Sequence, residues 1–144
     1  MSDFDLDAFL PYQLAVLASR VSDGFSALYR QKFGITIPEW RVVAHLSQAG
    51  SVSVREIHHK VDMDKSKVSR AASRLETSGY VTKRTNDSDR RLIELELTEK
   101  GRSMIDELAP IARVYEAEVL KDLGEKSACF RAAIETLLKE KATK

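Results

Sequence analysis

One feature constrains this chain more than any other: its hydrophobic period changes between Ser51 and Gly101. As far as Gly79, apolar residues recur every three or four positions, which predicts helices. From Ile93 to Leu97 apolar and acidic residues alternate, which predicts a half-buried strand. This part of the chain is therefore predicted to form two short helices followed by a β-hairpin.

Local signals indicate where these elements begin and end. Ser51 or Ser53 can cap the first short helix, which would pack through Val54, Ile57 and Val61. The segment 62–64, Asp-Met-Asp, separates it from a second helix that runs to Ser78. Gly79 follows at the position where a left-handed residue ends a helix. Two helices joined by so short a turn are a helix-turn-helix candidate.

The hairpin has strands within "YVTKR" and "RLIELEL" and a turn within "TNDSD". Asn, Asp and Ser favour turns, and Asp87 is expected to shape this one. A hairpin directly after the second helix of a helix-turn-helix is a wing. Arg90 and Arg91 lie where the second strand begins, close to Asp87 and Asp89.

Longer helices are predicted on both sides. One spans about Ala8–Phe33 and ends at Gly34, and another has Thr36 as a cap, Pro38 in its first turn and its end near Gly50. Thr98 caps the final helical region, in which Pro110 should kink the helix or begin a new turn. We expect a single domain over 1–144, with a winged helix-turn-helix over 36–97 and helical parts over 8–34 and 98–141.

The predicted fold class is α+β and mostly α: a winged helix-turn-helix core flanked by N-terminal and C-terminal dimerisation helices. A chain of 144 residues cannot easily bury the apolar stripes of both flanks on itself. Pairing with a second copy would cover them, and two-fold dimers are the commonest oligomers.

Composition excludes several classes of protein. With 43% hydrophobic and 31% charged residues, the chain can bury a core and is not expected to be disordered. It has no apolar run of about 18 residues, so no membrane span is expected. An acidic N-terminus unlike a signal peptide and a single cysteine, Cys129, predict a cytoplasmic protein. Cys129 is expected to be a small core or interface residue.

The net charge of +1 conceals an uneven distribution. Residues 51–91 hold ten lysines and arginines against six acids, a balance of +4, whereas the remainder is at −3. A basic centre between acidic flanks is typical of a protein that binds a polyanion.

The second short helix has two distinct faces when it is drawn at about 100° per residue. Apolar residues gather on one side (Val68, Ala71, Ala72, Leu75), and small hydroxyls and long cations gather on the other (Ser66, Lys67, Ser69, Arg70, Ser73, Arg74). Solvated helix faces usually mix charges of both signs, and this one carries no acid until its last turn. Because hydroxyls contact phosphates and arginine can read guanine, the pattern indicates DNA contact.

At this point the residues match a known family. The stretch "VDMDKSKVSRAASRLETSGYVTKRTNDSDRRLIELELTEKG" resembles the MarR family of bacterial transcription regulators in the order of its pieces. They are an acid-Lys-Ser-x-Val-Ser-Arg helix, Leu-Glu and then Gly before a strand, Asp-x-Arg in the wing, and Leu-Thr-Glu-Lys-Gly.

The resemblance implies a homodimeric DNA-binding regulator, most often a repressor, acting on pseudo-palindromic double-stranded DNA. By position, the major groove would receive Lys65, Ser66, Ser69 and Arg70. Arg91 would enter the minor groove, held by Asp89. The phosphate contacts would include Arg84 and Arg90.

Many members of the family respond to small aromatic or phenolic carboxylates, so the resemblance also implies an effector cleft. Aromatic walls with a cation would suit such an acid. The candidate lining residues are Tyr12, Arg20, Trp40, Arg41 and His45.

Metal, cofactor and enzymatic roles find no support in the sequence. His58 and His59 are adjacent and would point about 100° apart on a helix, so no metal is assigned to them. No catalytic constellation or phosphate-binding glycine loop is present, so neither a cofactor nor an enzyme is expected. The alternative to a DNA-binding regulator is a winged-helix module that binds another protein and not DNA.

Overall fold

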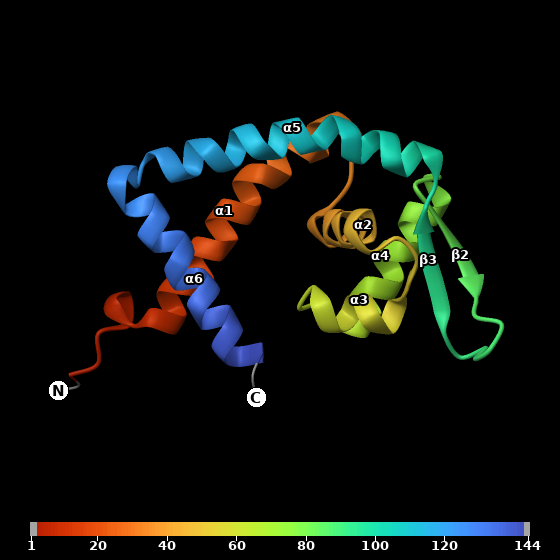
Figure 1. Ribbon diagram of the computed structural model, residues 1–144, viewed down its shortest axis with the longest axis horizontal. Coiled ribbons are helices and arrows are strands. Elements are labelled where there is room, and N and C mark those ends of the chain that lie inside the picture. Colours follow the sequence, from red (N-terminus) through yellow and green to blue (C-terminus); the bar gives the residue numbers. More distant parts are fainter. Residues whose placement is uncertain (1–2, 143–144) are drawn as a thin grey trace. The chain divides into compact units, whose positions relative to one another are not determined.

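In the computed structural model, residues 3–142 are described, with side chains as far as residue 139. The chain is mostly helical with one small antiparallel sheet, which confirms the predicted fold class (Figure 1). The elements are η1 Leu6–Ala8, α1 Leu10–Phe33, α2 Ile37–Ala49, β1 Val52–Ser53, α3 Val54–Lys60, α4 Lys65–Thr77, β2 Val81–Thr85, β3 Ile93–Leu97, α5 Glu99–Lys121, η2 Gly124–Lys126 and α6 Ser127–Ala142.

The chain forms two compact units, one up to Ala109 and one from Pro110 onward. The division lies inside α5, at Pro110. A proline has no N–H to donate to the carbonyl four positions earlier, so one helical hydrogen bond is missing there. The helix nevertheless continues through Pro110 as a single element.

The helix ends follow the local signals closely. Gly34 adopts a left-handed conformation with φ of 71° and ends α1. At the start of α2, the Thr36 side chain accepts the Glu39 N–H at 3.4 Å, and the Glu39 carboxylate accepts the Thr36 N–H at 2.9 Å. Ser53 caps α3 and Asp64 caps α4, each by accepting an N–H of the first turn. Of the two serines considered for α3, the structure therefore selects Ser53.

The sheet holds a third strand that the sequence did not indicate. β1 has only two residues and pairs antiparallel with β3, with Val52 opposite Leu95 and Ser53 opposite Glu94. The strand order is β1-β3-β2, so β3 is the central strand and the hairpin of β2 and β3 is tied to the start of α3. A strand this short is defined by its partner and has no periodicity of its own.

The core of the first unit lies between α2, α4, the sheet and the first half of α5. α4 contacts α2, α3 and β2, and α2 also contacts β3. The most deeply buried side chains are aliphatic and aromatic: Tyr29, Val42, Val43, Leu46, Ile57, Val68, Leu75, Val81, Leu95, Met104 and Leu108. α4 is therefore held on one side only, and its other side faces solvent.

The flanking helices keep large apolar side chains in solvent. On α1, Leu10, Leu14 and Leu17 are each about half exposed and recur at the spacing of one helix face. On α6, Leu137 and Leu138 are exposed at 53% and 64%. Cys129, also on α6, is exposed, so the expectation that it is a core residue is wrong and only the interface alternative stays open.

Candidate nucleic-acid interface

The two faces predicted for α4 are present. The four apolar residues are 0–3% exposed, whereas every residue predicted for DNA contact on this helix is exposed. The Asp64 cap accepts the Lys67 N–H at 2.8 Å, and the helix begins at Lys65, one residue before Ser66. The N-terminal part of α4, which carries several of these side chains, is therefore capped by the chain itself.

The outer face of α4 has two edges. At about 100° per residue, Lys65 and the three serines lie along one edge, and Lys67, Arg70 and Arg74 lie along the other. Lys67, Arg70 and Arg74 line a shallow groove of about 260 Å³ together with Thr36 and Pro38, at the beginning of α2. Three cations beside a helix N-terminus make a surface that favours phosphate.

Most of the cations are uncompensated. Among residues 3–139, Arg91 is the only one of the predicted DNA-binding cations that forms an ion pair. In the same described range, no carboxylate oxygen lies within 4.0 Å of the side-chain nitrogens of the others: Lys65, Lys67, Arg70, Arg74, Arg84 and Arg90. A basic surface that is not neutralised internally is suited to a polyanion.

Ser73 has a partner that the sequence did not indicate. Lys83, on β2, donates to the Ser73 hydroxyl at 2.7 Å and lies 3.9 Å from the Glu76 carboxylate. This contact joins α4 to the wing. The Ser73 hydroxyl accepts this bond, so its own O–H remains available to donate to DNA.

On the wing, Arg91 and Asp89 are joined as predicted. The Asp89 carboxylate accepts the backbone N–H of Arg91 at 3.0 Å and its Nε–H at 3.1 Å, and the second oxygen accepts from Nη2 at 3.3 Å. The side-chain hydrogen bond and then the backbone hydrogen bond from Arg91 hold the pKa of Asp89 below its usual value. The Arg91 side chain is still 85% exposed. The carboxylate thus orients a guanidinium that stays open to a ligand.

The turn itself is shaped by Asn86, and the expectation that Asp87 shapes it is wrong. Asn86 Oδ1 accepts the backbone N–H groups of Ser88 and Asp89 at 2.8 and 2.9 Å. This is the hydrogen-bonding pattern for which Asn is favoured in turns. The signal was in the sequence, since Asn and Asp are adjacent there, but the pattern alone does not say which one is used.

Arg55, at the start of α3, is a further residue near the wing turn that no sequence pattern indicated. Its charge lies near enough to Asp89 to help lower the pKa of that carboxyl. Only the folded chain brings α3 and the wing turn together, so no local pattern could have indicated this proximity.

The structure brings together only some of the residues predicted to line an effector cleft. Trp40 stacks on Tyr29 at 5.5 Å between ring centroids and meets Phe25 edge-on at 5.1 Å. Tyr12 precedes Tyr29 by 17 positions on α1, roughly 25 Å along the helix. Tyr12 and Trp40 of one chain therefore cannot line the same small pocket. Arg41 and His45 are half-buried and share a face of α2.

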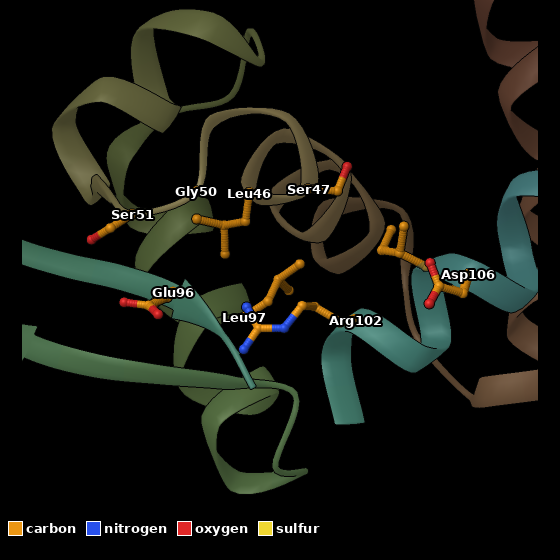
Figure 2. A pocket seen from close by; sticks show the side chains of 9 residues that line it. Leu46, Ser47, Gly50, Ser51, Glu96, Leu97, Arg102 and Asp106 are labelled. Carbon is orange, nitrogen blue, oxygen red and sulfur yellow. The ribbon is translucent and has the colours of Figure 1, made fainter. Parts of the chain in front are cut away.

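Another pocket, of about 420 Å³, lies at the base of the hairpin between α2, β3 and α5 (Figure 2). The Arg102 side chain extends from α5 toward β3, and Glu96 and Asp106 also line the pocket. Leu46, Leu97 and Ile105 provide apolar walls. The pocket offers one cation, two carboxylates and an apolar surface to a small molecule.

His58 has a structural contact. Its Nδ1 lies 2.5 Å from the carbonyl oxygen of Met63, which ties the end of α3 to the turn before α4. The His58 and His59 rings are 4.9 Å apart.

These features define a DNA-binding protein of the winged helix-turn-helix class. The family model described as "MarR family" matches residues 35–93. The HTH-type transcriptional repressor MdtR of Bacillus subtilis is 31% identical over 112 residues, which cover 78% of this chain and 72% of MdtR. The chain belongs to the MarR family, as its sequence predicted. It is a DNA-binding transcriptional regulator and not an enzyme.

Solved structures agree with this assignment. A MarR/EmrR family regulator from Acinetobacter sp. ADP1 has a TM-score of 0.82 and 28% identity, covering 97% of this chain and 99% of that one. BpsR of Bordetella bronchiseptica, whose DNA binding is regulated by 6-hydroxynicotinic acid, has a TM-score of 0.70 and 22% identity, covering 90% and 98%. At that identity, BpsR shows the shared fold alone. In the described part of the chain, no helix is long and apolar enough to span a membrane.

Proposed function

We propose that the protein is a homodimeric repressor that binds a pseudo-palindromic DNA site and is released from it by a small molecule. One observation carries the proposal: α4 presents an exposed, uncompensated basic face, next to a wing whose arginine is already oriented. In this proposal α4 enters the major groove and Arg91 enters the minor groove. A lone arginine there responds to the width and negative potential of the groove.

Contacts are assigned by their place on the fold. The base edges and nearby phosphates would meet the outer face of α4: Lys65, Ser66, Lys67, Ser69, Arg70, Ser73 and Arg74. Arg84 and Arg90 on the wing would contact the phosphate backbone, and Asp89 would position Arg91.

The apolar stripes support the homodimer. Leu10, Leu14 and Leu17 on α1, and Leu137 and Leu138 on α6, expose apolar surface that a soluble monomer rarely leaves uncovered. A second copy would bury these residues and place two copies of α4 on one DNA duplex. Half-sites would then lie about one helical turn apart.

DNA binding is tested by selecting bound sequences from fragmented genomic DNA and titrating the recovered duplex at several salt concentrations. Binding through several phosphates should weaken steeply as salt rises. Arg91→Ala should weaken binding sharply while sedimentation shows an unchanged dimer. Arg113→Ala, on α5 outside the winged part, is the matched control. A salt-independent interaction would favour the alternative, a module that binds another protein.

The effector is proposed to be a small aromatic or phenolic carboxylate, and two sites compete for it. The first would use Tyr12, Arg20, Trp40, Arg41 and His45, with Tyr12 contributed by the second copy. The other is the pocket of Figure 2, where Arg102 is the cation.

A screen for compounds that release the selected duplex, followed by Arg41→Ala and Arg102→Ala, distinguishes these sites. Loss of response in one variant only would identify the site. An unchanged response in both variants would exclude both arginines as effector contacts.

A further inference from the structure

A continuous chain of hydrogen bonds runs from the connection between α2 and α3 to the tip of the wing. The Ser51 hydroxyl donates to one carboxylate oxygen of Glu94 at 3.1 Å, and the other oxygen accepts from the Asn86 side-chain amide. Asn86 Oδ1 accepts the backbone N–H groups of Ser88 and Asp89. The bonds from Asn86 to Glu94 and from the Asp89 N–H to Asn86 are partly buried, so water competes only partly for these two.

The chemistry of the partners fixes the orientation of the Asn86 amide. Its oxygen faces two N–H donors, and its nitrogen faces a carboxylate that can only accept. In the opposite orientation, the amide nitrogen would face the two backbone N–H groups and the amide oxygen would face the Glu94 carboxylate, so none of these hydrogen bonds could form. Asn86 is thus specifically required: aspartate at this position could not donate to Glu94, and serine could not make all three contacts.

The chain ends on Arg91, because Asp89 accepts both its backbone N–H and its guanidinium. Two backbone hydrogen bonds also close the wing loop. Asn86 N–H donates to the Leu92 carbonyl and Leu92 N–H donates to the Asp89 carbonyl, each at 3.0 Å. A free guanidinium on an exposed loop loses rotamer freedom when it binds, and this loss weakens affinity. The bonds from Arg91 to Asp89 restrict the guanidinium before binding and so reduce that loss.

We infer that Asn86 and Glu94 are positioning residues for the DNA contact of Arg91. Glu94 orients the Asn86 amide, Asn86 holds the turn, and the turn places Asp89 where it directs the guanidinium outward. Ser51 links this arrangement to the helix-turn-helix. The inference rests on the proposed minor-groove role of Arg91 and goes beyond it, since neither residue has to touch DNA.

A double-mutant cycle tests the inference, with the duplex recovered by selection as the probe. Asn86→Ala, Arg91→Ala and the combination are compared with the unmodified chain by dissociation constant, and thermal unfolding confirms that each variant is folded. Asn86→Ala should weaken binding by about three- to tenfold when Arg91 is present and by less than about twofold when it is absent. Thr85→Ser, at the neighbouring exposed position on β2, is the matched control and should bind unchanged.

The second test exchanges the amide of Asn86 and the carboxylate of Glu94 between the two positions. Asn86→Asp alone places a carboxylate against Glu94 and should weaken binding. Adding Glu94→Gln lets the new amide donate to the new carboxylate and restores the original net charge, so binding should recover. Recovery that depends on Arg91 supports positioning, because restoring charge alone would act equally in the Arg91→Ala background.

The outcomes separate the inference from the proposed function. If Asn86→Ala weakens binding by the same factor with and without Arg91, Asn86 does not act through Arg91 and the inference is overturned, while Arg91 remains a DNA contact. If Arg91→Ala binds the duplex as tightly as the unmodified chain, both the minor-groove role and the inference are overturned.

Discussion

Replacing Gly101 with alanine should destabilise the protein, although the residue lies in a helix, where alanine is normally favoured. A Cβ at this position would lie 2.2 Å from the Tyr80 carbonyl oxygen and 3.0 Å from a methyl group of Leu97. An ordinary close C···O contact is about 3.3 Å, so the backbone would have to separate by roughly 1 Å. The Tyr80 carbonyl cannot move freely, because it accepts the Thr98 N–H at 3.0 Å.

The magnitude follows from two opposing contributions. Helix propensity favours alanine over glycine by up to about 1 kcal/mol, whereas overpacking a tight contact costs about 1–3 kcal/mol or more. Since the contact is with backbone, the overpacking cost should lie at the upper end of its range, and we expect a net loss of about 1–2 kcal/mol, or a fall in Tm of roughly 2–8 °C. DNA affinity should fall as well if the hairpin shifts against the start of α5.

Gly34 provides a matched control for the assay, which is thermal and denaturant unfolding at a fixed protein concentration. Gly34 also lacks a side chain, but it has a φ of 71° and open space around it. Gly34→Ala should therefore cost about 1 kcal/mol for conformation alone, and Gly34→Asn should recover part of this. Gly101→Asn, in contrast, should be worse than Gly101→Ala. A rise in Tm for Gly101→Ala would refute the reasoning.

Three further predictions concern capping and ionisation. Thr36→Ala removes the hydroxyl that accepts the Glu39 N–H and should lower the free energy of unfolding by about 1 kcal/mol, whereas Thr36→Ser should retain most of it, as denaturant titration would show. Burial raises the pKa of Tyr29 to about 12 from 10.0, so the unfolded chain ionises first and stability should fall as pH rises from 10 toward 12; Tyr29→Phe should remove that part of the slope. The pKa of Asp89 lies below 3.8, so its link to Arg91 should persist above that pH and be lost as pH falls through the lower folded value, which the NMR signal of the Arg91 Nε–H would report.

Much of the DNA-binding part could be predicted because the signals are local. The two faces of α4 follow from a helical period over 13 residues, and the cap at Thr36 is recognisable within one turn. The pairing of Asp89 with Arg91 spans two positions and was predicted correctly.

The residues of one cleft come from separate helices, so the sequence does not show which of them meet. Tyr12 and Trp40 are both aromatic residues on amphipathic helices, and nothing local reveals that Trp40 stacks on Tyr29, roughly 25 Å along α1 from Tyr12. In the same way, Glu94 and Asn86 face each other only because β2 and β3 pair in one register, with Arg84 opposite Glu94.

The sequence by itself determined the family, the order of the helices and the hairpin, and the residues that form the basic face of α4. These properties depend on local periodicity, capping and short motifs, which contacts elsewhere in the fold do not alter. Only the tertiary structure decided that β1 joins the sheet, that Asn86 and not Asp87 holds the wing turn, and that Gly101 can have no side chain. β1 and Gly101 depend on contacts between residues that are distant in sequence, and these contacts exist only once the chain has packed. The wing turn depends on which of two adjacent turn-forming residues finds its partners.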